Sequence, residues 1–250
     1  MENQDASRVM RMPFAKRLAS EGAALLNMHC IEHPSQPNYI ALASGNTWGV
    51  HDDATLTLNV RHLGDVIEER GLSWRTYAEE YPGNCYTSSS ASGGLFVRRH
   101  VPFLEFYNVI TNKERCNARV VNATQFDADV ASGTLPTFSF YVPDQNHNGH
   151  DTDLDTADAW LESRFGPLMH DPRFTDGTLF ILTYDESGSY SITDIATIFW
   201  GAGVKVGATS TKYYDLYDLL RTIEAILHTN TLGQEDERTG EPMTDVLSIQ

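Results

Sequence analysis

Apolar positions along the chain recur with two different spacings, which predict alternating helices and strands. Helical spacing predicts helices over residues 12–21, 37–45, 62–71, 157–169 and 213–228. Short apolar runs predict strands over residues 24–32, 73–79, 135–143, 177–187 and 192–201. The run GTLFILTYDES at 177–187 is the clearest of these, and its unbroken apolar core is typical of a strand buried on both faces.

Strands that alternate with helices favour a layered α/β domain with a largely parallel sheet. The sequence contains no internal repeat and no long linker, and 250 residues suffice for one large domain with a real core. We therefore expect residues 1–250 to form a single domain, in which the acidic segment 232–250 is a mobile tail.

Three polar clusters follow predicted strands directly. Ser35 comes after the strand 24–32, the loop DQNHNGHD at 144–151 follows 135–143, and Asp185 and Glu186 end the strand 177–187. Ligands of open α/β sheets collect beyond the carboxyl ends of the strands, so these clusters predict one shared site.

The charge balance restricts what such a site can bind. The formal net charge is −16, which argues against a general nucleic-acid surface. An acidic protein repels a phosphate substrate unless a bound cation compensates, so a phosphoester enzyme of this composition needs a metal ion. No apolar run approaches the roughly 20 residues of a membrane-spanning helix.

The pair Asp185 and Glu186 has two interpretations. Carboxylates at the mouth of a buried strand are costly unless a positive charge answers them, and a divalent cation such as Mg²⁺, Ca²⁺, Mn²⁺ or zinc would do so. The alternative is a strand that simply ends in polar residues at the surface.

Ser35 also has two interpretations. At a helix N-terminus its hydroxyl lies among free backbone N–H groups, an environment that suits a nucleophile attacking a phosphate, especially with a metal on its oxygen. The alternative is an ordinary N-cap, which is the commonest role of serine at such a position.

The loop 144–151 carries His147, Asn148, His150 and Asp151 around a glycine. Its histidines could bind a metal, donate to a phosphate or protonate a leaving group. An ordinary polar turn explains the same composition.

The three cysteines, Cys30, Cys85 and Cys116, match no zinc motif. One disulfide is compatible with the sequence, and Cys85 with Cys116 is the favoured pair because both lie in polar, loop-like segments. The polar start MENQDASRV contains no signal peptide.

Taken together, these segments resemble the phosphoesterase family that holds bacterial phospholipases C and the acid phosphatases of bacteria and fungi, within the alkaline-phosphatase-like superfamily. The resemblance runs through MENQDASRV, EGAALLNMHCIEHPSQPNYIALASG, GLSWRTYAEEYPGNC, VRRHVPFLEF, LPTFSFYVPDQNHNGHD, LFILTYDES and YDLLRTIEAIL. The block HPSQPNYIALASG is the most characteristic. The resemblance implies a three-layer α/β/α sandwich of the alkaline-phosphatase type.

The resemblance also implies a set of site residues. The nucleophile falls on Ser35, with a divalent metal ion of unknown identity held by Glu2, Asn3, Ser35, Asp185 and Glu186. The loop histidine of the family falls on His150 beside Asp151, and supportive histidines fall on His33 and His100. The implied reaction is attack of Ser35 on phosphorus, followed by hydrolysis of the phosphoserine.

The sequence departs from the family pattern at three places. Relatives carry an apolar strand directly before the Glu-Asn pair, so we expect an N-terminally truncated domain whose first strand is missing. The loop has His147 and Asn148 where the family has Asn-Asp, and Leu216 stands where relatives carry a histidine.

The leading functional hypothesis is an acid phosphatase-like phosphomonoesterase, because the short chain lacks the long C-terminal extension common in phospholipases C. The alternatives are a phospholipase C-like phosphodiesterase, a catalytically impaired member acting as a binding module, and a domain that binds an anion without turnover. The implied partner is a small phosphoester, with no nucleic acid and no membrane span, and the oligomeric state stays open. By resemblance the protein is secreted or extracytoplasmic.

Overall fold

The computed structural model describes residues 1–249 and places most strands in two sheets. The larger sheet holds β1 (Ala23–His29), β7 (Leu179–Leu182), β8 (Asp194–Gly201), β9 (Thr209–Ser210) and β10 (Tyr214–Asp215). The smaller sheet holds β2 (Trp74–Ala78), β5 (Val120–Asn122) and β6 (Phe138–Val142), while β3 (Ser90–Ala91) pairs with β4 (Phe96–Val97). The strand orders are β10-β1-β8-β7, with β9 beside β1, and β5-β2-β6.

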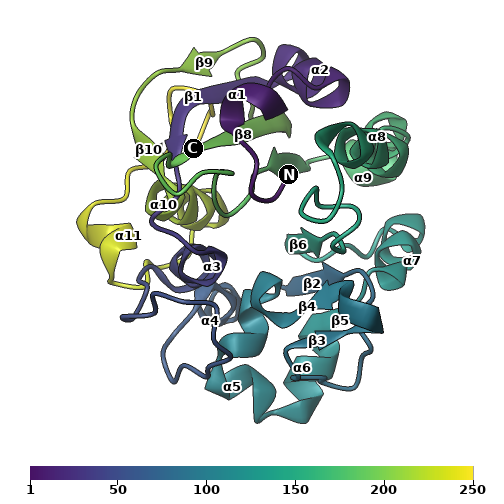
Figure 1. Cartoon of the computed structure of the whole chain (residues 1–250), viewed down its shortest axis with the longest axis vertical. Helices are drawn as coiled ribbons and strands as arrows, with labels where there is room; N and C mark the ends of the chain where they lie inside the picture. Colours follow the sequence, from purple (N-terminus) through teal and green to yellow (C-terminus); the bar gives the residue numbers. More distant parts are fainter. Residues whose placement is uncertain (250) are drawn as a thin grey trace.

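Helices lie around both sheets (Figure 1). They are α1 (Ala6–Val9), α2 (Pro13–Glu21), α3 (Ser35–Ser44), α4 (Leu63–Glu69), α5 (Tyr107–Ile110), α6 (Lys113–Arg119), α7 (Thr124–Ser132), α8 (Leu154–Phe165), α9 (Pro172–Thr175), α10 (Leu216–Leu227) and α11 (Glu235–Arg238). Each of the five predicted helices and five predicted strands overlaps an observed one of the same type, which confirms the α/β fold class.

The pairing of the strands brings their carboxyl ends together. β1 is parallel to β9 and β10, and β2 is parallel to β5 and β6, so the sheets are largely parallel as predicted. β8 is the exception, because it is antiparallel to both β1 and β7. It follows that β1 and β7 run in the same direction, and the segments after them, which begin near Ser35 and Asp185, lie at one edge.

The two sheets do not join. β6 and β7 are edge strands, and a cavity of about 640 Å³ lies between them. The prediction that 177–187 is buried on both faces is therefore wrong for its middle, since Leu179, Phe180 and Ile181 are only partly buried. Within residues 1–249 no strand pairs with the free edge of β6 or β7.

The segment 232–249 packs against the domain, so the expectation of a mobile tail there is wrong. Met243, Val246 and Leu247 are buried, and the Met243 N–H donates to the Thr222 hydroxyl of α10 at 3.0 Å. These apolar side chains are scattered among acidic residues, which conceals them in the sequence. Gln250, the last residue of the predicted tail, lies outside the described residues.

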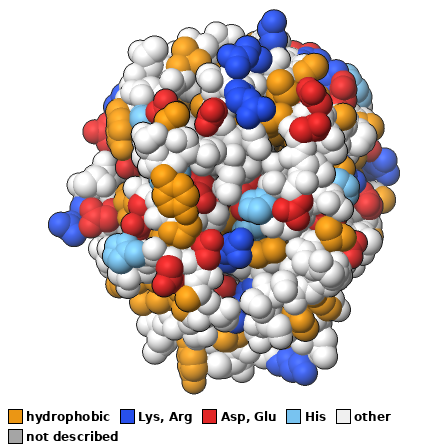
Figure 2. All heavy atoms as spheres, in the orientation of Figure 1, with side chains coloured by type: hydrophobic (Ala, Val, Ile, Leu, Met, Phe, Trp, Pro, Cys, Tyr) orange, Lys and Arg blue, Asp and Glu red, His pale blue; other side chains and the backbone are white. Residues whose placement is uncertain are grey.

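Cys85 and Cys116 form a disulfide, which confirms the favoured pairing, and Cys30 is free and buried. The bond ties the loop before β3 to α6. On the face that Figure 2 shows, acidic and basic side chains are interspersed rather than gathered in a basic track. Among the described residues, no helix combines the length and the apolar character needed to cross a bilayer.

Candidate active site

Ser35 is the first residue of α3 and is buried, with 3% of its surface exposed. The N-cap of this helix is Pro34, and no side chain caps it, so the N-cap interpretation of Ser35 is wrong. Its hydroxyl instead donates to Glu186 Oε1 at 2.8 Å. The serine therefore faces the acidic residues that follow β7.

Asn38 shapes the loop that presents the serine. Its Oδ1 accepts from the N–H groups of Ile31 and Glu32 at 2.8 and 3.2 Å. Its Nδ2 donates to the carbonyls of Glu32 and Pro34 at 2.7 and 3.1 Å. One buried amide thus satisfies four backbone groups between β1 and α3, which holds the turn before Ser35 in place.

Asp185 and Glu186 are both buried, so the interpretation of a strand that ends at the surface is wrong. Neither carboxylate oxygen of Asp185 has a hydrogen-bond partner among the described residues. Burial, with Glu2 and Glu186 close by, raises the pKa of the Asp185 carboxyl well above its ordinary value. Such a group is costly in this position unless a cation or a proton neutralises it.

Glu2 and Asn3 reach the same place from the start of the chain. Glu2 is 2% exposed, and its N–H donates to the Asn148 carbonyl at 2.7 Å while its Oε2 accepts from Asn148 Nδ2 at 2.6 Å. His100 Nε2 lies 2.8 Å from Glu2 Oε1 as an ion pair without hydrogen-bond geometry. Burial opposes ionisation of Glu2 and His100 favours it, so that the pKa of Glu2 is lowered on balance. Asn3 Oδ1 is buried without a partner among the described residues.

The histidines divide into an inner and an outer group. His33 forms an ion pair with Glu186 through Nδ1, and its Nε2 lies 2.9 Å from the carbonyl of Ile192. His100 is buried and packs against Tyr39 at a ring distance of 5.3 Å. His150 and Asp151 are exposed and pair with each other at 2.6 Å, without a side-chain bond to Ser35 or the buried acids in the described part of the chain.

The departures from the family pattern have clear places in the structure. Asn148, which stands where a carboxylate was expected, fastens Glu2 and also donates to Gln145 Oε1 at 2.6 Å. Leu216 is buried at the start of α10 and lines the cavity beside β7. Sequence reasoning assigned no role to Asn38, to Asn148 as a support for Glu2, or to Tyr190, whose ring stacks on His33 at 4.8 Å.

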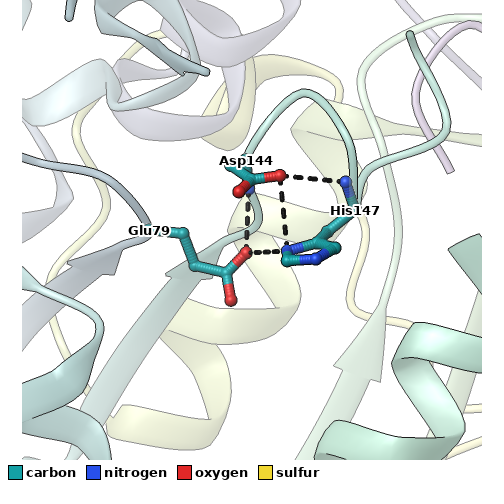
Figure 3. A group of neighbouring side chains, drawn as sticks. All are labelled: Glu79, Asp144 and His147. Atoms are coloured by element: carbon teal, nitrogen blue, oxygen red, sulfur yellow. Dashed lines mark hydrogen bonds and ion pairs between the residues drawn. The ribbon is translucent and has the colours of Figure 1, made fainter. Parts of the chain in front are cut away.

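A second cluster of ligand-type residues joins Glu79, which follows β2, to Asp144 and His147 of the loop after β6 (Figure 3). One ligand atom from each lies within 4.8 Å of the others. His147 Nδ1 is 2.6 Å from Glu79 Oε2, which also accepts the Asp144 N–H at 3.1 Å, and Tyr141 donates to Glu79 Oε1 at 3.0 Å. The members of this cluster already pair with one another.

The residues around Ser35 form the other candidate site for a metal ion. Among the described residues, both oxygens of Asp185 and Oδ1 of Asn3 are buried without partners, and Ser35 Oγ donates to the neighbouring Glu186. Carboxylate, amide and hydroxyl oxygens are hard ligands of the kind that Mg²⁺, Ca²⁺ and Mn²⁺ prefer. The residues present thus suit a divalent cation next to a serine hydroxyl.

Comparison with known proteins identifies the family of this chain. The chain matches the Phosphoesterase family over residues 5–229. The chain belongs to this family. A phosphate-repressible acid phosphatase of Penicillium chrysogenum is 31% identical over 247 residues, which cover 94% of this chain and 59% of that protein. A phosphatidylinositol-3-phosphatase of Mycobacterium tuberculosis is 31% identical over 237 residues, which cover 94% of this chain and 75% of that protein.

The chain spans 55 to 59% of the length of the fungal acid phosphatases that it matches. A solved phosphonate monoester hydrolase from Silicibacter pomeroyi superposes on 97% of this phosphoesterase chain and 74% of its own, with a TM-score of 0.63 and 10% identity. At that identity the likeness establishes the fold alone. It supports the alkaline-phosphatase-like architecture that the sequence predicts.

Proposed function

We propose that this chain is a metal-dependent phosphomonoesterase that acts through a phosphoserine at Ser35. The observation that carries the proposal is the buried cluster in which Ser35 Oγ donates to Glu186 while both oxygens of Asp185 have no partner among the described residues. The fungal acid phosphatases and the phosphatidylinositol-3-phosphatase among the relatives favour a small phosphomonoester as substrate.

Glu2, Asn3, Asp185 and Glu186 would hold the cation together with Ser35 Oγ. When bound, a divalent ion lowers the pKa of an alcohol oxygen next to it and offsets negative charge on a phosphoryl group. The need for such an ion follows from the charge of the protein as well, because a net charge of −16 repels a phosphoester.

The chain's own residues supply the rest of the reaction. Glu186 accepts the hydrogen bond of Ser35 and is oriented by His33, so the serine proton leaves towards a carboxylate that a histidine already holds. Ser35 Oγ then forms the bond to phosphorus as the bond to the leaving oxygen breaks. Water next cleaves the phosphoserine and returns Ser35.

The remaining residues position this machinery. Asn38 holds the turn before Ser35, and Asn148 and His100 hold Glu2 at the carboxyl end of the sheets. His150 lies at the rim, where an imidazolium would protonate the leaving alkoxide. Its Nδ1 lies 2.6 Å from Asp151 Oδ1.

We also propose an extracytoplasmic location. The disulfide between Cys85 and Cys116 supports it, because structural disulfides persist in oxidising compartments and are rare in the cytosol.

Hydrolysis of a chromogenic phosphomonoester tests the function, measured after chelation and again with added Mg²⁺, Mn²⁺, Ca²⁺ or Zn²⁺. We expect metal-dependent turnover that falls by about a thousandfold or more in Ser35→Ala, because the nucleophile is lost. Ser132→Ala is a matched control, since Ser132 lies at the end of α7 and, among the described residues, its hydroxyl bonds only to its own helix and Thr134.

Trapping at low pH followed by mass spectrometry should find phosphate on the peptide that contains Ser35. Equal rates for the Ser35→Ala variant and the unchanged chain would refute the proposal. Absence of turnover in the unchanged chain with every metal would favour the impaired member of the family instead.

A further inference from the structure

The loop that follows Glu186 carries two exposed apolar side chains. It runs through residues 187–193 and contains no charged side chain, in a protein whose formal net charge is −16. Tyr190 is 78% exposed and Ile192 is 38% exposed. Single apolar side chains are common on protein surfaces, so the place of these two relative to Ser35 decides what they do.

A short series of contacts joins Tyr190 to the proposed nucleophile. The Tyr190 ring stacks on the His33 ring, with 4.8 Å between the centroids and 27° between the planes. His33 Nδ1 pairs with Glu186 Oε2, and Glu186 Oε1 accepts from the Ser35 hydroxyl at 2.8 Å. Only His33 and Glu186 therefore stand between Tyr190 and Ser35. Because His33 covers one face of the ring and most of Tyr190 is exposed, the other face is open.

Hydrogen bonds fix the loop that presents Tyr190. The Ile192 carbonyl accepts from the Ser187 hydroxyl and lies 2.9 Å from His33 Nε2. The Ile192 N–H donates to the Ser189 carbonyl at 2.9 Å, which closes a turn around Tyr190. The ring is therefore held beside His33 before a ligand arrives, and such preorganisation lowers the entropic cost of binding.

Charged side chains border Ser35 on another side. Asp53 Oδ1 accepts the N–H of Gln36, the residue next to Ser35, at 3.0 Å. Asp53 Oδ2 lies 3.5 Å from Arg99 Nε. Together with the buried acids that follow β7, this pair leaves the loop 187–193 as an uncharged and partly apolar border of the site. The part of a substrate that meets this loop should therefore be uncharged and apolar.

We propose that Tyr190 and Ile192 form a subsite for the leaving group of the substrate, and that this group is a flat aromatic ring. The inference rests on the proposed phosphomonoesterase reaction at Ser35. An aromatic leaving group stacks on the open face of Tyr190 and removes apolar surface of both residues from water. A polyol leaving group keeps its hydroxyls hydrated and gains far less there. Tyr190 thus determines specificity, while bond making stays with Ser35.

Paired kinetic measurements test the subsite. The value of kcat/KM is measured for 2-naphthyl phosphate and for glycerol 1-phosphate, with the unchanged chain and with Tyr190→Ala, at saturating metal. Comparing each substrate with itself across the two proteins cancels the difference in leaving-group reactivity. We expect Tyr190→Ala to lower the naphthyl value about tenfold and the glycerol value by less than about threefold. Equal losses would show that Tyr190 acts only through His33, and an unchanged naphthyl value would also overturn the proposal.

Two further variants control for the stacking on histidine. Tyr190→Phe keeps the ring, so it should restore most of the naphthyl rate that Tyr190→Ala loses. Tyr213→Ala is the matched control, because Tyr213 is 58% exposed and stacks on His29 at 4.5 Å. Within the described residues, His29 forms no hydrogen bond or ion pair with Glu186 or Ser35. A naphthyl loss in Tyr213→Ala as large as that in Tyr190→Ala, or no recovery in Tyr190→Phe, would contradict the proposal.

Binding measurements separate this proposal from the proposed function. The probes 2-naphthylmethylphosphonate and methylphosphonate share a phosphonate group whose P–C bond is not hydrolysed, so neither needs turnover. In calorimetric titrations of the unchanged chain with Mn²⁺ present, the naphthyl compound should bind about tenfold more tightly, and Tyr190→Ala should reduce this ratio to about threefold or less. If hydrolysis fails and this difference remains, the proposed function is wrong and the subsite stands as a ligand site. Equal affinities, or no binding of either compound, would overturn the subsite.

Discussion

Asp185 and Glu224 are both buried carboxyl groups, and neither has a hydrogen-bond partner for either oxygen among the described residues. Around Asp185 lie further oxygen-bearing side chains, namely Glu2 and the Ser35–Glu186 pair. Glu224 has one acidic neighbour, Asp236, whose oxygens already accept the N–H groups of Leu232 and Gln234.

The difference lies in what can neutralise each group. Burial, and then the charge of Asp236, raises the pKa of Glu224 to about 9. The carboxyl group is therefore protonated, and neutral, at pH 7. Asp185 belongs to a set of converging oxygens that also suits a cation. An unpartnered buried acid therefore marks a metal site only where further ligands converge on it.

The largest expected effect comes from Asp185→Asn. Replacing a charged ligand by an amide should weaken metal binding and lower phosphatase activity by about a hundredfold or more. The metal-free variant should be more stable than the metal-free unchanged chain, because the burial of a carboxylate is relieved. Calorimetric titration with Mn²⁺ and thermal unfolding in a chelator measure the two effects.

The matched control is Asp176→Asn, a carboxylate beyond α9 and away from Ser35. If the Asp185→Asn variant binds metal as tightly as the unchanged chain, the proposed difference between the two residues is wrong. Asp185 would then be neutralised by a proton, as Glu224 is.

The next effect concerns the pH dependence of stability and arises from Glu224. Its pKa rises from an ordinary 4.5 to about 9 in the folded chain, so between these values the folded state keeps a proton that the unfolded state releases. The contribution to stability is therefore lost as pH rises, by about 1 kcal/mol per pH unit, and levels off above about pH 9.

Glu224→Gln removes this titration and should flatten the stability profile without changing metal affinity. Urea unfolding at pH 5, 7 and 9 in a chelator gives the slopes, and Glu162→Gln is the control because Glu162 is exposed and paired with Arg17. Parallel slopes for the Glu224→Gln variant and the unchanged chain would mean that Glu224 is already ionised.

The smallest effect is expected at the second cluster. In Glu79→Gln the amide still accepts from Tyr141 or from the Asp144 N–H, so phosphatase activity should change by less than about threefold. Steady-state rates with and without added Mn²⁺ check this. A large, metal-reversible loss would show that the Glu79, Asp144 and His147 cluster binds an ion that the reaction needs.

The sequence predicted those parts of the site that follow strands. Ser35, Asp185 and Glu186 could be identified because polar residues directly after apolar runs meet at one edge of a parallel sheet. Glu2 and Asn3 were assigned through resemblance alone, since no periodic pattern leads into them. Asn38 supports the site by bonding to backbone groups, and Asn148 supports it by bonding to Glu2, 146 residues away in the sequence. No local sequence pattern encodes either contact.

The packing of the end of the chain was missed for a related reason. Met243, Val246 and Leu247 are too few and too irregularly spaced to form a helical or strand pattern. Met243 bonds to Thr222 of α10, whereas Val246 and Leu247 pair with Lys205 and Val204, and these contacts between distant parts of the chain emerge only on folding.

The disulfide between Cys85 and Cys116 encloses His100, the histidine that faces Glu2. Closing a ring over 31 residues lowers the conformational entropy of the unfolded chain and adds about 3 to 4 kcal/mol to stability in the simplest loop model. The disulfide therefore still restricts the conformations of the segment around His100 when the rest of the molecule unfolds. On refolding, the loop that carries His100 therefore starts with its two ends already joined, and it has only to meet Glu2 from outside the loop.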